Sequence, residues 1–276
     1  MKKNVARHRG LCFFSLCVLF CLTAVVHADV FQTETTLELV SPATAPRLRA
    51  ITLNKGPTAL YELNLRLEGL GQTSTTLIRP KLGLNETNRV TFGLNVGTRS
   101  GTFPLVVWTE FRDKDRIPVS MCDVTLFSNV SKPDSDLIIR SEDVLIRTRS
   151  RLLYGVLNNG KERKRVMIRL LAPGVLGVEN TIRQIDSEPG SMMSIEFNLM
   201  NRYAAPGDVE HIFFIAEYER GPLHYCTVAK NVVTISGKGK HLSGMGHVIG
   251  VLVVCSGLIW MGMVIYERKK TCTGDL

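Results

Sequence analysis

An internal duplication constrains the fold of this 276-residue chain more than any other feature. Leu53-Asn54-Lys55-Gly56 recurs 104 residues later as Leu157-Asn158-Asn159-Gly160, and Pro118-Val119-Ser120-Met121-Cys122 recurs at the same offset as Pro222-Leu223-His224-Tyr225-Cys226. Three further pairs follow in the same order at offsets of 103 to 105, namely residues 65–67 with 168–170, 78–79 with 182–183, and 92–94 with 197–199. Correspondences that keep their order at one spacing indicate two copies of a single domain.

Each copy has the pattern of short β-strands. Residues 60–68 alternate apolar and polar side chains, which is typical of a strand with one buried and one solvated face. Turn-forming residues such as Asn54-Lys55-Gly56 and Asn85 separate the strands, and Asn159-Gly160 suits a tight hairpin because both residues tolerate positive φ. The predicted strands are residues 36–40, 47–53, 60–67, 89–96, 102–111 and 118–127, then 152–157, 165–171, 194–200, 210–217 and 223–235.

Six or seven short strands in about 100 residues favour an immunoglobulin-like sandwich. We therefore predict an all-β exterior of two tandem immunoglobulin-like antiparallel β-sandwiches, followed by one transmembrane helix. The predicted segments are a signal peptide at 1–28, sandwiches at 29–130 and 131–236, a stalk at 237–246, the helix at 247–266 and a tail at 267–276.

The two ends of the chain indicate a membrane topology. Residues 248–266 are nineteen residues without a formal charge, long enough as a helix to cross a bilayer, and Arg268, Lys269 and Lys270 follow directly. At the other end, a basic segment, an apolar run at 11–26 and Val26-His27-Ala28 have the form of a cleaved secretory signal. An uncleaved signal anchor, with two spans, remains the alternative. We expect the exterior to lie outside the cytoplasm, in a periplasm or at a cell surface, and the C-terminus to be cytoplasmic.

The charge outside these ends is small. Of the net charge of +9, the signal segment contributes +4, residues 29–243 contribute +4 and the tail contributes +1. A near-neutral exterior lacks the basic stripe typical of nucleic-acid binding, so we predict no nucleic-acid partner.

The strand pattern resembles bacterial cell-surface sandwich modules of the CARDB type. The residues that carry the resemblance are Asn54, Gly56, Phe92, Leu94 and Gly101 in the first copy, and Asn158, Gly160, Pro189, Gly190, Phe197, Leu199 and Gly207 in the second. The resemblance implies a spacer, adhesion or assembly role and brings no catalytic residues with it. An acidic residue common near the middle of a late strand in such modules is replaced here by Trp108 and Ala216.

Only two of the seven cysteines, Cys122 and Cys226, belong to the predicted exterior. Their strand parity favours burial of each thiol in its own domain core. The alternative is a disulfide that joins the two domains, because they are the only exported pair.

A basic run in the second copy consists of Lys161, Arg163, Lys164, Arg165 and Arg169. These side chains are candidates for contact with anionic lipid headgroups or an anionic glycan. The alternative interpretation is the polar face of an exposed edge strand.

No motif for catalysis or cofactor binding is present in the sequence. The exterior histidines His211, His224 and His241 lack metal-ligand spacing, and no nucleophile motif surrounds any serine. We therefore predict a non-enzyme without metal or cofactor. Gly246 and Gly250 have the small-residue spacing that lets transmembrane helices pair, which makes a homodimer a further hypothesis.

These inferences lead to a functional expectation. We expect a non-catalytic single-pass envelope protein that is held in the lipid bilayer and whose tandem sandwiches mediate interaction or scaffolding with another envelope protein. The alternatives are a surface adhesin or glycan-binding protein, and an accessory subunit of a membrane enzyme or transporter.

Overall fold

The computed structural model describes residues 33–40, 45–131 and 135–237. Secondary structure in these ranges consists of β-strands without a helix, which confirms the all-β class. Within them, no helix has the length and apolarity that crossing a bilayer requires. The predicted signal peptide, transmembrane helix and cytoplasmic tail lie outside the described residues, and so does most of the stalk.

The first domain contains eight strands in two sheets. They are β1 (Thr33–Val40), β2 (Arg47–Asn54), β3 (Leu60–Gly69), β4 (Gln72–Thr75), β5 (Arg79–Leu82), β6 (Thr87–Gly93), β7 (Ser100–Arg112) and β8 (Pro118–Ser128). One sheet has the order β1-β2-β6, and the other contains β4, β3 and β7, with β5 paired to β3 and β8 to β7. Fourteen buried apolar side chains, from Leu48 to Phe127, form the core of this domain.

The second domain contains nine strands in the same kind of arrangement. They are β9 (Leu137–Arg140), β10 (Val144–Ile146), β11 (Arg149–Asn158), β12 (Lys164–Leu171), β13 (Leu176–Val178), β14 (Ile182–Ser187), β15 (Met192–Asn201), β16 (Val209–Arg220) and β17 (Leu223–Ile235). A four-stranded sheet has the order β13-β15-β11-β9, while β14, β12, β16 and β17 belong to the other sheet, in which β10 also pairs with β17. The core, from Leu137 to Ile235, includes stacked Tyr154 and Phe214 rings 4.2 Å apart.

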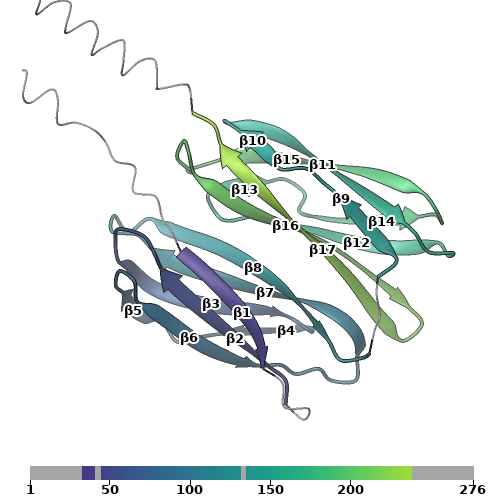
Figure 1. Ribbon diagram of the computed structural model, residues 1–276, viewed down its shortest axis with the longest axis horizontal. Coiled ribbons are helices and arrows are strands. Elements are labelled where there is room, and N and C mark those ends of the chain that lie inside the picture. Colours follow the sequence, from purple (N-terminus) through teal and green to yellow (C-terminus); the bar gives the residue numbers. More distant parts are fainter. Residues whose placement is uncertain (1–32, 41–44, 132–134, 238–276) are drawn as a thin grey trace, which may run out of the picture.

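The two domains lie side by side, and one sheet continues from one to the other (Figure 1). Leu223 and His224 of β17 pair in parallel with Ser100 and Gly101 of β7. This short contact joins the sheets into ten strands.

A buried asparagine in each domain shows that the duplication extends to side-chain contacts. Asn54 donates through Nδ2 to the carbonyl oxygen of Thr58 at 2.8 Å, and its Oδ1 accepts from the backbone N–H of Gly56 at 3.1 Å. Asn158 donates to the carbonyl of Glu162 at 2.8 Å and accepts from Gly160 at 3.0 Å. Both asparagines are fully buried, because these bonds replace the water that an amide otherwise needs.

The Asn-x-Gly segments do not form hairpins, so the prediction of a tight hairpin at Asn159-Gly160 was wrong. The strand before this segment, β11, pairs with β9 and β15, whereas the strand after it, β12, pairs with β14 and β16. The segment therefore crosses from one sheet to the other. The buried asparagine secures this crossing.

The strand β3 departs from simple alternation. Leu60 is buried on the same side as Leu63 because the register with β7 shifts between Tyr61 and Asn64, and Glu62 has φ of +53°. This β-bulge inserts one residue, so the buried positions before and after it are three residues apart instead of two. The predicted alternation of residues 60–68 would place Leu60 on the solvated face, together with Glu62, and at Leu60 it was therefore wrong.

We predict that Asn54→Ala and Asn158→Ala each lower the free energy of unfolding by about 2–4 kcal/mol. Each substitution leaves buried carbonyl and N–H groups of a sheet crossing without partners, at about 1–3 kcal/mol for each such group. Denaturant titration of each variant measures the loss.

The control is Asn198→Ala, because Asn198 is exposed on β15. Its effect should stay within about 0.5 kcal/mol. Equal effects of Asn54→Ala and Asn198→Ala would contradict the role of the buried asparagines.

Candidate functional site

The interface between the two domains is the first feature that can act as a site. Apolar side chains on the outward faces of β7, β8, β16 and β17 form a third buried cluster, distinct from both domain cores. Its buried members are Val106, Cys122, Phe213, Ile215 and Cys226, with Trp108, Val124, Leu171 and Val228 packed around them. This interdomain cluster binds the two sandwiches together by removing apolar surface from water.

Polar and aromatic contacts extend the interface at the end where β17 pairs with β7. The His224 ring stacks on Phe103 of the first domain with centroids 4.7 Å apart and an interplanar angle of 4°. Nε2 of His224 lies 3.1 Å from Oε1 of Glu217, and Nε of Arg169 lies 3.3 Å from Oε2 of the same carboxylate. These contacts hold charged groups of the second domain in a fixed place beside the first.

Close backbone approach is a second requirement of this junction. A Cβ on Gly101 would overlap the backbone of His224, and Gly101 has φ of +136°, which favours glycine. Elsewhere along the interface, the N–H of Gly174 donates to the carbonyl of Ser120 at 2.7 Å. The domains therefore contact each other through backbone as well as side chains.

A cleft of about 520 Å³ lies where β1, β8, β16 and β17 meet. Both domains line it, with Asp123 from the first and Glu210, His211 and Lys230 from the second among the titratable side chains. Burial raises the pKa of the Asp123 carboxyl to about 7, and burial, followed by the nearby Asp208 charge, raises the pKa of Glu210 to about 7. Burial likewise lowers the pKa of His211, whose Nδ1 has no hydrogen-bond partner in the described part.

The raised pKa values of Asp123 and Glu210 give the cleft two groups that can take up protons near neutral pH. Within residues 33–40, 45–131 and 135–237, no three His, Cys, Asp or Glu side chains are grouped so as to hold a metal ion. Sequence reasoning missed this cleft, because Asp123 and Glu210 belong to different domains. Each is a carboxylate within a predicted strand, and the sequence alone gives no sign that the two strands meet.

The two exterior cysteines differ from their predicted place. Cys122 and Cys226 are buried in the interdomain cluster rather than in their own domain cores, because the outward faces of β8 and β17 are covered by the other domain. Both thiols are free in the structure, so the alternative of an interdomain disulfide is not formed there. Burial raises the pKa of both thiols, which keeps them protonated and unreactive while the interface is closed.

The basic run is divided among three environments rather than gathered on one surface. Lys161, Arg163 and Arg165 are exposed, Arg169 lies at the domain interface and Lys164 is buried. Arg163 Nη2 lies 2.9 Å from Oδ2 of Asp186, and Arg165 Nε lies 3.7 Å from its Oδ1. Lys164 and Arg169 are therefore not available to an external anion, and contact of the other three with one remains a prediction.

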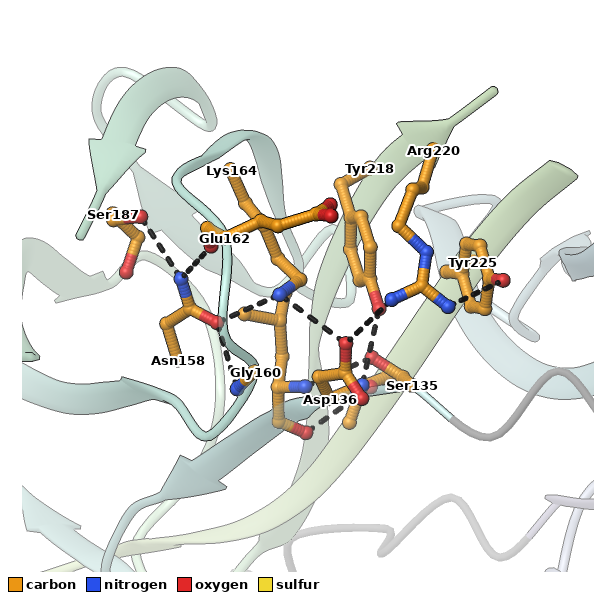
Figure 2. Close-up of polar contacts among 12 residues, drawn as sticks. Ser135, Asp136, Asn158, Gly160, Glu162, Lys164, Ser187, Tyr218, Arg220 and Tyr225 are labelled. Carbon is orange, nitrogen blue, oxygen red and sulfur yellow. Dashed lines mark hydrogen bonds and ion pairs between the residues drawn. The ribbon is translucent and has the colours of Figure 1, made fainter. Parts of the chain in front are cut away.

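Lys164 belongs to a polar cluster at the start of the second domain (Figure 2). Its Nζ donates to Oδ1 of Asn158 at 2.8 Å, lies 3.2 Å from Oδ2 of Asp136 and sits 5.3 Å from the Tyr218 ring centroid. Arg220 also contacts Asp136, at 3.3 Å, and stacks over Tyr225. We call Asp136, Asn158, Gly160, Lys164, Tyr218 and Arg220 the lysine cluster.

Comparison with known proteins identifies no family for this chain. No family model matches it, and no curated protein sequence matches it. Among solved structures, a Salmonella alpha-2-macroglobulin mutant is 11% identical, with a TM-score of 0.30, over 76% of this chain and 17% of that protein. The chain thus corresponds to less than a fifth of that protein's length.

Two further solved structures show similarly distant likeness. Red sea bream transglutaminase is 12% identical over 84% of this chain and 34% of that chain, with a TM-score of 0.27. A PapD-like domain of human CEP192 is 12% identical over 41% of this chain and 96% of that domain, with a TM-score of 0.29. Likeness at this level gives no information about activity or partners.

We predict that Gly101→Ala opens the domain interface. The added methyl group overlaps the His224 backbone, and overpacking of this kind costs about 1–3 kcal/mol. A cost of about 1.4 kcal/mol to the closed interface raises the population of the open interface about tenfold. Because the thiols of Cys122 and Cys226 react only when the interface is open, their alkylation in the native protein should accelerate by about tenfold.

Gly93→Ala is the matched control, because a Cβ there meets no atom within 4 Å. Its alkylation rate should equal that of the unaltered protein. Equal rates for Gly101→Ala and Gly93→Ala would show that the β7–β17 junction does not hold the domains together.

We predict that the acids of the cleft destabilise the folded protein as pH rises. A carboxyl whose folded pKa is raised binds more protons in the folded state, so its contribution to stability is lost between its unfolded value, near 4, and its folded value of about 7. The melting temperature of Asp123→Asn/Glu210→Gln relative to the unaltered protein should therefore increase from pH 5 to pH 8.

Both the unaltered protein and Asp123→Asn/Glu210→Gln retain His211. The pKa of His211 is lowered, so its contribution to stability is lost as pH falls, which is opposite to the effect of the carboxyls. Comparing two proteins that share His211 removes its contribution from the difference. A constant difference in melting temperature across this range would show that the two carboxyls are not perturbed.

Proposed function

We propose that this chain is a non-catalytic single-pass envelope protein whose paired β-sandwich domains bind another envelope protein. The proposal combines the export signal and the apolar C-terminal stretch of the sequence with an apolar surface on the second domain. That surface lies on the outward face of the four-stranded sheet, away from the domain core.

An exposed row of apolar side chains across three strands is the observation that carries the proposal. Ile138 of β9 is opposite Leu157 of β11, and Leu157 is opposite Met192 of β15. Ile138 is 43% exposed, Met192 is 46% exposed and Leu153, further along β11, is 61% exposed. We call Ile138, Leu153, Leu157 and Met192 the apolar strip.

Charged groups surround the apolar strip. Arg140 lies two residues after Ile138 on β9, opposite Gly155, and Glu196 of β15 lies opposite Leu153. The Glu196 side chain forms an ion pair with Arg151 at 3.3 Å. An apolar centre with a polar rim is the usual anatomy of a protein–protein interface.

The end of the sheet beside the strip adds a second mode of contact. β9 is the terminal strand of the four-stranded sheet, so an extended segment of a partner can pair with its free side. Such pairing would place the partner's side chains next to Ile138.

The rigid connection of the two domains supports a scaffolding role. The interdomain cluster and the β7–β17 junction fix the apolar strip relative to the first domain. A partner bound to the strip would therefore meet a defined second surface. The predicted stalk of 237–246 would keep both near the bilayer.

Substitution of the apolar strip tests the proposal in the full-length protein in its own membrane. We expect Ile138→Glu and Met192→Glu each to reduce the amount of a cross-linked partner protein by about tenfold, since a central contact of 1–2 kcal/mol is lost. Because both side chains are already partly exposed, melting temperatures should remain nearly unchanged.

Leu77→Glu is the control, because Leu77 in the first domain is 95% exposed and belongs to no strand. It should leave cross-linking intact. A partner that is captured equally by all three variants, or cross-linking to lipid alone, would overturn the proposed binding surface.

A further inference from the structure

Lys164 is buried beside the side-chain amide of Asn158 and donates a hydrogen bond to its oxygen. Lys164 is 5% exposed, and its Nζ is 2.8 Å from Oδ1 of Asn158, so the amine and the amide carbonyl are in direct contact (Figure 2). Asn158 itself has no exposed surface. Burial excludes the water that would otherwise solvate the amine or hydrolyse an activated amide.

The amide is held rigidly with its oxygen facing a hydrogen-bond donor. Nδ2 of Asn158 donates to the carbonyl oxygens of Glu162 at 2.8 Å and Ser187 at 2.9 Å. The backbone N–H of Gly160 donates to Oδ1 at 3.0 Å. A fixed N–H directed at a carbonyl oxygen stabilises the negative charge that develops when a nucleophile adds to the carbonyl.

Asp136 is placed to move the proton. Its Oδ2 lies 3.2 Å from Nζ of Lys164. The Asp136 backbone is fixed at both polar atoms, since its N–H donates to Oη of Tyr218 at 3.0 Å and its carbonyl accepts from the N–H of Asn159 at 2.9 Å. A carboxylate in this position can act as general base for the amine.

Gly160 provides the space in which these groups meet. A Cβ at this position would overlap Nζ of Lys164 and would lie 2.8 Å from Oδ2 of Asp136. Any larger residue would therefore separate the amine from the carboxylate.

We propose that Lys164 and Asn158 form an intramolecular amide cross-link. The Lys164 ammonium passes a proton to Asp136, and the free amine attacks Cγ of Asn158 while the carbonyl electrons move to Oδ1, beside the Gly160 N–H. A second proton passes from the attacking nitrogen to Nδ2, the carbonyl bond to Oδ1 forms again, and the Cγ–Nδ2 bond breaks. The released ammonia takes up the proton held by Asp136, so the products are a secondary amide and one ammonium ion. No oxidant or cofactor is required.

The first domain is a natural comparison for this arrangement. Asn54 has the same bonds to Gly56 and Thr58, but the residue six positions later is Leu60, at the start of β3, where the second domain has Lys164 at the start of β12. Both residues are buried. The sheet crossing therefore needs the asparagine but not a lysine, and the contact between an amine and the asparagine amide is specific to the second domain.

Mass spectrometry of the full-length protein tests the proposal. The intact mass should be lower by one ammonia molecule than the mass calculated for the mature chain, and trypsin should leave residues 152–161 joined to the Lys164-Arg165 peptide. Lys164→Arg keeps the positive charge beside Asp136 but lacks a nucleophilic amine, so it should show the full mass and no joined peptide.

Two comparisons separate this cross-link from other events. A succinimide at Asn159-Gly160 also loses ammonia, but it would persist in Lys164→Arg and would join no peptides. Asp136→Asn should fold and should reduce the cross-linked fraction at least tenfold, because the proton acceptor is lost. Full mass in the unaltered protein, or ammonia loss that persists in Lys164→Arg, would overturn the proposal without bearing on the apolar strip.

Discussion

The packing of the outward faces of β7, β8, β16 and β17 against each other is the constraint on which the rest of the exterior depends. Residues such as Val106, Phe213 and Ile215 point away from their own domain cores and are nevertheless fully or almost fully buried. They become buried only when the other domain is present. Because apolar burial is the main source of stability, this interdomain cluster converts two sandwiches into one unit. The stacked His224 and Phe103 rings and the close approach at Gly101 then fix the position of each domain along the interface.

The two copies have diverged at corresponding positions in ways that suit different tasks. The buried Asn54 and Asn158 make the same hydrogen bonds because both copies cross between sheets at the same point. Six residues later, the first domain has an apolar side chain and the second has Lys164 in contact with Asp136. Asp136 directly follows the connection between the domains. The lysine cluster therefore secures the entry of the chain into the second domain.

Much of the fold could be predicted from the sequence, because the repeat and the strand periodicity are local signals. Eleven of the seventeen strands in the described part of the chain correspond to predicted ones. Short strands such as β4, β10 and β13 were missed, since three or four residues are too few to show alternation. The environments of Cys122, Cys226 and Lys164 could not be predicted either. Strand parity tells which residues share a face, but it does not tell whether solvent, a core or another domain covers that face.

The central claim, that the two sandwiches form one rigid exterior, is tested most directly by amide ¹⁵N relaxation of the two-domain region. Residues 45–131 and 135–236 should give the same rotational correlation time, with a value appropriate to the whole exterior. Two shorter and different correlation times, each appropriate to a single sandwich, would show that the domains reorient independently and would contradict the account.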